Sequence, residues 1–267
     1  MNNLIPQKIH FHLGVEKPVK ILHLTDTHVA LADERNENMI EYSKRARRIF
    51  FEEAQCPERD PVGYLEEAME YSKNFDCTVM TGDLADFNTY KIYDTLKAIL
   101  AGKDYLFCAG NHEFTPKPGI DSYELKANTA DYVQSHFRGN MFFESRIIGG
   151  VNIVAADNGY YVWTKEQFER LKAEVAKGLP ILLFTHVPVH PHLKEADWFR
   201  HHAQIPGATE ELFELSAKVT RYLSEESLFK GFCSGHWHNN AFIDFDGKPS
   251  YVLGGLFKGI VGEITID

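Results

Sequence analysis

The sequence lacks the features that mark membrane, secreted and repeat proteins. No apolar stretch approaches the roughly 20 residues that a membrane-spanning helix requires. The first 13 residues include Lys8, His10 and His12, so they lack the apolar block of a secretion signal. We find no internal repeat, no low-complexity segment and no linker between domains. These absences predict a soluble, cytoplasmic protein with no membrane partner, folded as one domain over residues 1–267.

Cysteine is scarce and scattered. The four cysteines, Cys56, Cys77, Cys108 and Cys233, include no Cys-x-x-Cys pair. Three of them lie in or beside apolar segments that we expect to be buried strands. We therefore predict reduced, unreactive core residues rather than a disulfide framework.

Positive charge is in deficit. The chain has 28 Lys and Arg against 38 Asp and Glu, which gives a formal charge of −10. A large nucleic-acid interface needs a basic stripe, so we expect no stable nucleic-acid partner. A small anionic substrate remains compatible with this charge, because bound metal ions reverse the local field. The sequence leaves the oligomeric state open.

The pattern of apolar residues predicts an α/β fold. Helices are expected at about 36–55, 61–74, 88–100, 123–136, 164–178 and 209–223, with a loop over 187–207. Strands are expected at 8–13, 20–25, 77–81, 105–109, 141–148, 151–155, 181–185, 232–233, 241–245, 250–253 and 259–266. Gly149-Gly150 is typical of a hairpin turn, and Thr164 with Gln167 is typical of a capping box.

Five segments share one arrangement, in which a short apolar run ends in a side chain that can bind metal. These segments are residues 20–28, 79–83, 106–113, 182–186 and 232–238. Ligands of α/β sheets collect beyond the carboxyl ends of the strands, so we expect these side chains to meet at one rim. They are Asp26, His28, Asp83, Asn111, His186, His236 and His238. Carboxylates and imidazoles without a thiolate suit Mn, Fe or Zn.

Some of the aspartates and histidines of the sequence also have a structural interpretation. Asp83 taken alone fits equally well as the cap of a following helix. The His-x-His pair at His10 and His12 alternates with apolar residues, which favours a solvated strand face. A second pair, at His190 and His192, lies in the loop after His186. There it would either contact substrate or be an ordinary part of the loop.

Taken together, the five segments resemble the calcineurin-like metallophosphoesterase superfamily. The resemblance spans residues 26–238 and includes Gly82-Asp83, Gly110-Asn111-His112-Glu113 and Gly235-His236-x-His238. It implies a four-layer α/β sandwich of two mixed β-sheets flanked by helices. It also implies two metal ions: Asp26, His28, Asp83 and His238 would hold the first, and Asp83, Asn111, His186 and His236 the second.

The resemblance further implies hydrolysis of a phosphate ester. A hydroxide bridging the two metals would attack the phosphate ester. Two divalent ions, the carboxylates of Asp26 and Asp83, and this hydroxide would give the site a net charge near +1 inside an acidic protein. His112 would not ligate; it would be the catalytic residue that donates a proton or a hydrogen bond to the leaving group. Small-molecule, nucleotide-like phosphodiesters are favoured as substrates. The alternatives are a phosphomonoesterase or phosphoprotein phosphatase and, more remotely, a metal-binding scaffold without activity.

Two departures from the family pattern bear on the site. Asp26 and Asp83 lie 57 positions apart, and the surplus is a charged helical insertion at about 33–60, which is a candidate lid. The position three residues after Asp83 is Asp86 instead of the tyrosine of purple acid phosphatases, which argues against an Fe(III)–tyrosinate centre.

Candidate substrate-binding residues lie outside the signature segments. Arg45 and Arg48 on the insertion would recognise a second phosphate, or else form a solvated helix face. Trp198 and His201 lie in the loop after His186 and would stack on a nucleobase or pack the loop, and His190 in the same loop is a candidate substrate contact.

Overall fold

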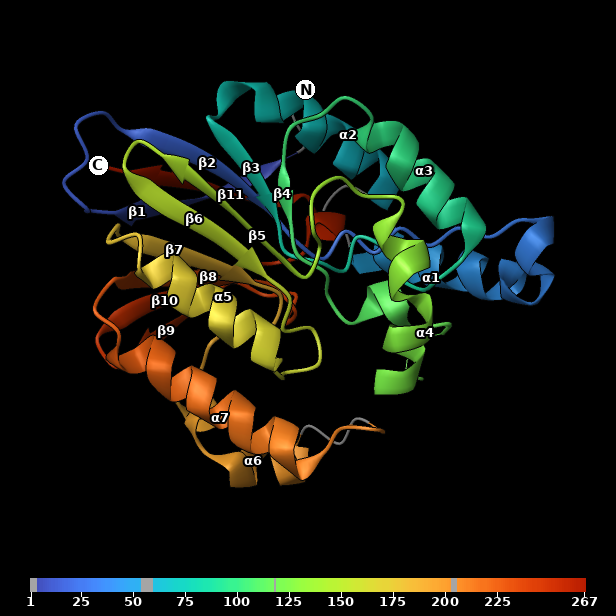
Figure 1. Cartoon of the computed structure of the whole chain (residues 1–267). Coiled ribbons are helices and arrows are strands. Elements are labelled where there is room, and N and C mark those ends of the chain that lie inside the picture. The colour runs from blue at the N-terminus through green and yellow to red at the C-terminus, as the bar shows by residue number, and fades with distance from the viewer. Residues whose placement is uncertain (1–3, 54–59, 118, 203–205) are drawn as a thin grey trace.

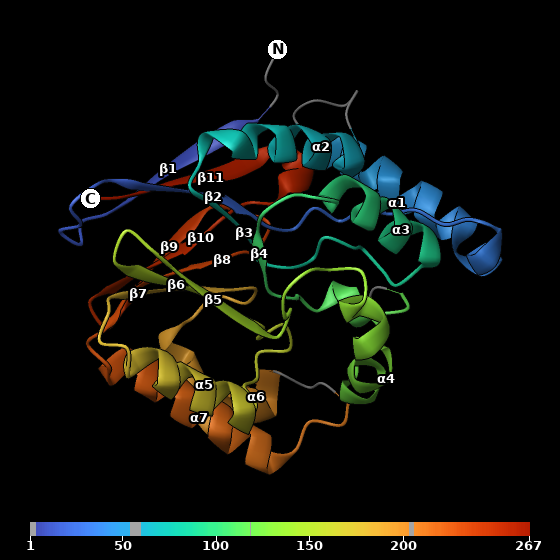
Figure 2. The ribbon, with the colours of Figure 1, turned by 45° about the horizontal axis from the view of Figure 1, so that its top comes forward.

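Two mixed β-sheets stack face to face and are flanked by helices on both outer sides (Figures 1 and 2). The computed structural model describes residues 4–53, 60–117, 119–202 and 206–267. Helices α2 and α3 lie outside one sheet, whereas α5 and α7 lie outside the other (Figure 2). The predicted four-layer α/β sandwich is confirmed.

The first sheet has its last strand inserted between its first two. In spatial order its strands are β1 (Ile5–Phe11), β11 (Ile260–Ile266), β2 (Val19–Leu24), β3 (Cys77–Met80) and β4 (Leu106–Phe107). β11 runs parallel to β1 and antiparallel to β2, while β2, β3 and β4 are parallel to one another. The three parallel strands end at one edge, where the site lies.

The second sheet also has a parallel centre. In spatial order its strands are β5 (Phe143–Ile148), β6 (Val151–Ala156), β7 (Ile181–Thr185), β8 (Phe229–Ser234), β10 (Lys248–Val252) and β9 (Ala241–Phe245). β6, β7, β8 and β10 are parallel, and the two edge strands are antiparallel to them. Gly149 and Gly150 both have positive φ, at +57° and +83°, which is the hairpin turn that the glycine pair predicts.

The helices surround the sheets at positions close to those predicted. They are α1 (Ile40–Glu53), α2 (Pro61–Tyr71), α3 (Tyr90–Leu100), α4 (Tyr123–Gln134), α5 (Lys165–Val175), α6 (Ala196–His202) and α7 (Glu210–Glu225). Short 3-10 helices are η1 (Glu34–Met39), η2 (Ser72–Asn74), η3 (His112–Phe114), η4 (Pro191–Lys194) and η5 (Leu256–Lys258). The capping box at Thr164 and Gln167 is present at the start of α5. None of the described helices has the length and apolar character needed to cross a membrane.

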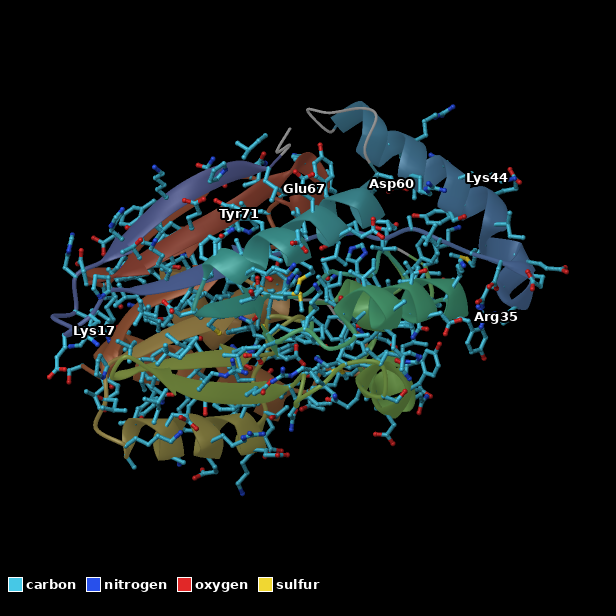
Figure 3. All side chains as sticks on the ribbon, turned by 90° about the horizontal axis from the view of Figure 1, so that it is seen from above. Lys17, Arg35, Lys44, Asp60, Glu67 and Tyr71 are labelled. Carbon is cyan, nitrogen blue, oxygen red and sulfur yellow. The ribbon has the colours of Figure 1, made fainter. Side chains whose placement is uncertain are left out.

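The helical insertion lies at the margin of the molecule. Seen from above, η1 and α1 extend beyond the sheets, with Arg35 and Lys44 along them (Figure 3). Arg47 Nη2 lies 2.6 Å from Asp60 Oδ2, which ties α1 to the start of α2. The side chain of Tyr42 reaches inward, with its ring 5.4 Å from that of Phe87. The part of the predicted insertion at 54–59 lies outside the described residues.

Apolar side chains from both sheets fill the space between them. Ile21 and Val79 of the first sheet pack with Leu182 and Phe184 of the second, and all four are fully buried. Three cysteines are buried in this core and form no disulfide, as predicted: Cys77, Cys108 and Cys233. Burial raises the pKa of Cys77 to about 11, so that thiol is unreactive near neutral pH. Cys56 lies outside the described residues.

The loop predicted over 187–207 contains two short helices instead. Pro191 occupies the first turn of η4, and the His190 side chain accepts a hydrogen bond from the backbone N–H of His192. α6 has only seven residues, too few for a helical period to stand out in the sequence. β8 likewise begins at Phe229, three residues before the predicted strand. His10 and His12 are exposed on either side of buried Phe11, as expected of a solvated face.

Candidate metal centre

All seven predicted ligands meet at one rim, beyond the carboxyl ends of strands from both sheets. Asp26 and His28 follow β2, Asp83 follows β3 and Asn111 follows β4. The second sheet contributes His186 after β7, and His236 and His238 after β8. Helix α3 begins after an N-cap at Thr89, so Asp83 does not cap it and the alternative interpretation of Asp83 is excluded.

Most of these residues have a backbone conformation that non-glycine residues rarely adopt. Five have positive φ between +51° and +70°: Asp26, His28, Asp83, His236 and His238. Such residues cost about 1–3 kcal/mol each and persist only where the surroundings enforce them, typically at functional sites. Backbone hydrogen bonds hold the two sharp turns together, from Asp26 N to Gly82 O at 3.0 Å and from His28 N to Asp83 O at 2.9 Å.

One group of side chains surrounds a point between the two sheets. It consists of Asp26, His28, Asp83 and His238, each of which offers one ligand atom. The Nε2 atoms of His28 and His238 lie 2.9 Å apart. Asp26 Oδ1 lies 3.3 Å from Nε2 of His238 and 3.7 Å from Nε2 of His28. Asp83 Oδ2 lies 3.8 Å from Nε2 of His28.

A second group shares the same oxygen of Asp83. His186 Nε2 lies 3.2 Å from Asp83 Oδ2 and 3.1 Å from Asn111 Oδ1. His236 Nδ1 lies 3.1 Å from the same nitrogen of His186. Asp83 Oδ2 therefore belongs to two groups of ligand atoms at once.

The spacing within each group fits metal ligation better than it fits hydrogen bonding. Two ligand atoms at about 2.1 Å from one ion and at right angles to each other lie about 3.0 Å apart. The facing nitrogens of His28 and His238 lie at that distance, where a hydrogen bond would need one of them to hold a proton toward the other. Asp26 Oδ1 is buried and accepts no hydrogen bond in the described part of the chain. A cation would satisfy that oxygen.

Hydrogen bonds on the outer side of the imidazoles select the nitrogen that faces inward. His28 Nδ1 lies 2.9 Å from Asp86 Oδ1, and His186 Nδ1 donates to the Thr81 carbonyl at 2.7 Å. His236 Nε2 lies 2.7 Å from the Tyr161 hydroxyl. Each ring then turns its other nitrogen toward its group, the arrangement by which partners of ligating histidines fix tautomer and orientation.

The two aspartates and the imidazoles perturb one another's protonation. Burial lowers the pKa of His186, but the carboxylate of Asp83 outweighs it and raises that pKa to about 9. Burial raises the pKa of Asp83, but the imidazoles of His186 and His112 outweigh it and hold it well below its usual range. Burial and the nearby His186 lower the pKa of His236 to about 4. Protons and metal ions therefore compete for these nitrogens.

Two glycines make this close approach possible. A Cβ on Gly110 would lie 2.2 Å from Asp83 Oδ1. A Cβ on Gly235 would lie 1.9 Å from Thr25 Oγ1 and 2.2 Å from Asp26 Oδ2. Any side chain at either position would displace a predicted ligand, which explains the glycine directly before Asn111 and before His236.

A buried carboxylate beneath the site was not assigned a role from the sequence. Glu113 is fully buried, and its two oxygens accept hydrogen bonds from four backbone N–H groups: those of Asp83 (2.9 Å), Leu84 (2.6 Å), Ala85 (3.3 Å) and Gly110 (2.7 Å). Burial and the Asp83 carboxylate raise the pKa of Glu113, while the N–H groups oppose the rise. In the sequence it is the last residue of the segment Gly110-Asn111-His112-Glu113, and that position alone does not indicate what the carboxylate does.

His112 lies beside the two groups, farther from the shared oxygen of Asp83 than His186 is. Its side chain is 21% exposed, and Nε2 lies 4.0 Å from Asp83 Oδ2. Nδ1 donates to the backbone carbonyl of Asp86 at 2.8 Å, which leaves Nε2 as the nitrogen nearer to the shared oxygen. The His112 backbone N–H donates to Asp83 Oδ1 at 2.9 Å.

The five predicted substrate-binding residues separate into two sets. His190 and Trp198 line a cavity next to the second group. Arg45 and Arg48 are exposed on α1, and His201 is exposed on α6. Among the described residues, no hydrogen bond or ion pair joins Arg45 or His201 to the seven ligands. Their role in binding substrate stays a prediction, as does the lid.

Comparison with known proteins supports the family that the sequence resembles. A model of the calcineurin-like phosphoesterase family matches residues 19–240. No curated protein matches the chain. Similar solved structures include TT1561 of Thermus thermophilus, with 13% identity, a TM-score of 0.48, and coverage of 90% of this chain and 91% of that one. The phosphopantetheinyl hydrolase PptH of Mycobacterium tuberculosis has 13% identity, a TM-score of 0.44 and coverage of 90% of both chains.

A candidate 5′-nucleotidase of Staphylococcus aureus has 13% identity and a TM-score of 0.47. The match covers 90% of the present chain but 49% of the nucleotidase, so this chain spans about half of that protein. The family match extends over most of the chain and includes every residue of both ligand groups. The chain therefore belongs to the calcineurin-like phosphoesterase family.

Proposed function

We propose that the protein hydrolyses a phosphodiester of a small molecule at a centre of two metal ions. The observation that carries this proposal is the position of Asp83 Oδ2 within both groups of ligand atoms. A carboxylate shared in this way holds two ions a few ångströms apart, the spacing suited to clamping the attacking and leaving oxygens of a phosphate ester.

Each ion would have its own set of side chains. Asp26, His28, Asp83 and His238 would hold the first ion, and Asp83, Asn111, His186 and His236 the second. This mixture of carboxylate, amide and imidazole ligands suits Mn, Fe or Zn. When bound, the ions would supply Lewis acidity and an activated water molecule. The protein's part is to fix the ligands in space, through the left-handed turns and the hydrogen bonds behind each ring.

We assign His112 to the leaving group. Its Nδ1–H is held by the Asp86 carbonyl, so the ring is oriented with Nε2 toward the centre. A protonated Nε2 in this place can donate to the leaving oxygen, a role typically worth about 10²–10⁴-fold in rate. Its partial exposure gives the proton a route to solvent.

The preference for a diester rests on the charge of the site. The seven ligands and His112 include no guanidinium or ammonium group, the usual partners of the second negative charge of a phosphate monoester. A diester carries one negative charge and needs no such partner. A monoesterase, including a phosphoprotein phosphatase, is the alternative, and it would need a cation from outside this set.

Metal analysis and paired assays test the proposal. The purified protein is analysed for bound metal and then assayed with Mn on bis-p-nitrophenyl phosphate and on p-nitrophenyl phosphate. We expect about two ions per chain and a higher kcat/KM on the diester. Asp83→Asn should lose both metal and activity, whereas Asp131→Asn, an exposed aspartate on α4, should keep both. A preference for the monoester would overturn the diester assignment, and an Asp83→Asn variant that keeps two ions would overturn the shared centre.

A further inference from the structure

A small cavity borders the second group of ligands. It is lined by Tyr161, Val187, Pro188, His190, His192, Leu193, Trp198 and Trp237, and we call it the ring cavity. Its volume is about 170 Å³. The lining consists of aromatic, imidazole and aliphatic side chains, with no aspartate, glutamate, lysine or arginine among these residues.

The ring cavity is joined directly to the proposed centre. The Tyr161 hydroxyl lies 2.7 Å from Nε2 of His236, whose other nitrogen belongs to the second group. Val187 directly follows His186, and Trp237 lies between His236 and His238. A group esterified to a phosphate at the centre would therefore lie beside the cavity.

The walls of the cavity present ring faces and edges. The rings of Trp198 and Tyr161 are 5.4 Å apart and inclined at 44°. The imidazoles of His190 and His192 stack at 4.6 Å. Trp237 is 43% exposed, so it lies at the mouth. Phe199, the neighbour of Trp198, is fully buried and stacks on Phe213, so α6 uses Phe199 for packing and directs Trp198 to the cavity.

We propose that the ring cavity binds an uncharged planar ring attached to the scissile phosphate, which makes esters of nucleosides or of aryl alcohols the substrate class. This inference rests on the proposed function, because the centre must hold the phosphate. The ring would gain apolar burial and stacking against Trp198 and Tyr161.

Size and charge both favour a single ring system over other occupants. Sites for drug-sized ligands have volumes of about 300–1,000 Å³, so about 170 Å³ accommodates one ring system. A second phosphate or a charged peptide side chain would find no guanidinium, ammonium or carboxylate partner in this lining and would lose its hydration. A short aliphatic group would fit but would leave the ring faces uncovered.

Binding of phosphonates, which are not hydrolysed, tests the inference separately from catalysis. Phenylphosphonate, methylphosphonate and the phosphonate analogue of adenosine 5′-monophosphate, in which a CH₂ group replaces the ester oxygen, are titrated calorimetrically onto the Mn-loaded protein. Stacking of a base on an aromatic side chain is worth about 10-fold or more in affinity. We expect phenylphosphonate and the nucleotide to bind about 10-fold tighter than methylphosphonate. Trp198→Ala should abolish this difference without changing the affinity for methylphosphonate.

Two further variants test whether the loss of ring binding in Trp198→Ala comes from the missing ring itself. Trp198→Phe should restore most of the preference, because it keeps a ring at the wall. Phe242→Ala removes an aromatic side chain that is 61% exposed and outside the cavity, so it should bind all three probes like the wild type. Binding of the nucleotide without binding of phenylphosphonate would show that the cavity takes nucleobases. Equal affinities for the two would show that it takes other aryl groups as well.

A second measurement applies even if the centre does not bind phosphate. Adenosine, which has no phosphate, is titrated onto the chelator-treated protein while the tryptophan indole N–H signals are followed by NMR. Shifts of the Trp198 and Trp237 signals would support the ring cavity even if all phosphonates failed to bind, an outcome that would refute the proposed function alone. Equal phosphonate affinities in wild type and Trp198→Ala, together with unshifted indole signals, would overturn the inference.

Discussion

Replacing Glu113 by glutamine should destabilise the protein out of proportion to the size of the change. The substitution keeps the shape of the side chain and replaces one carboxylate oxygen by an NH₂ group. Each oxygen of Glu113 now accepts from two backbone N–H groups, Oε2 from Asp83 and Gly110, and Oε1 from Leu84 and Ala85. An amide nitrogen accepts no hydrogen bond, so two buried donors would lose their partner.

The expected loss follows from those two donors. A hydrogen bond to a charged group contributes about 1.5–3 kcal/mol, and a donor left buried without an acceptor costs a similar amount. Two such bonds give a loss of about 3–6 kcal/mol, a large part of the roughly 5–15 kcal/mol that stabilises a typical domain. At about 2–4 °C per kcal/mol, the midpoint of thermal unfolding should fall by about 6–24 °C.

Urea unfolding followed by tryptophan fluorescence measures this loss. It is done at pH 7 in the presence of a chelator, so that metal binding does not contribute to the free energy of unfolding. Glu16→Gln, an exposed glutamate between β1 and β2, is the matched control and should change stability by less than about 0.5 kcal/mol. A second titration with Mn should show about 10–100-fold weaker metal binding by Glu113→Gln, because its backbone partners position Asp83.

A loss of less than about 1 kcal/mol would refute this reasoning. It would mean that the four N–H groups find other acceptors, or that the turns after β3 and β4 hold their shape without the carboxylate. Unchanged metal affinity together with a large loss of stability would separate the two roles, and would leave Glu113 as a structural residue alone.

Three further predictions concern the histidines. His112→Ala should lower kcat by about 10²–10⁴-fold while metal analysis finds the wild-type content; lost metal would instead make His112 a ligand. Metal binding should strengthen between pH 6 and 8 and release protons, because His186, with its pKa raised to about 9, must give up a proton to ligate. Calorimetry in buffers of different ionisation enthalpy measures the protons released. Metal affinity that does not change with pH would contradict this prediction. Burial lowers the pKa of His23 to about 3, so the unfolded chain takes up a proton below about pH 6.5 that the folded chain does not, and stability is lost as the pH falls. From pH 6.5 to 5 this loss is about 2 kcal/mol, so over that interval His23→Gln should lose less stability in urea unfolding than the wild type, by about that amount.

The convergence of the seven proposed ligands could be predicted because each lies in a segment where a short apolar run ends in polar side chains. A buried strand followed at once by a polar side chain leaves that side chain at the sheet rim, whichever strands it pairs with. Asp83 and His186 are therefore placed by local sequence, although 103 positions separate them. Their atoms lie close together because the parallel strands of both sheets end on the same side of the molecule.

The supporting residues could not be predicted, because their partners are distant in sequence and carry no pattern. Tyr161 reaches His236 across 75 positions, and Glu113 accepts from Asp83 across 30. Trp198 and Phe199 are adjacent and chemically alike, so composition does not distinguish their roles. Helix α6 separates them, because successive helical side chains point about 100° apart, and one then packs while the other lines the cavity.

The position of β11 constrains the order in which the protein can assemble. Strands β1 and β2 leave a gap one strand wide, and β11, which fills it, is synthesised after all the other described strands. Until then β1 has no partner in this sheet, and the inner edge of β2 stays open for pairing with other chains. Pairing across almost the whole sequence also makes closure slow. A nascent chain stalled before Ile260 would thus have its ligand-bearing turns but only an incomplete platform beneath half of them.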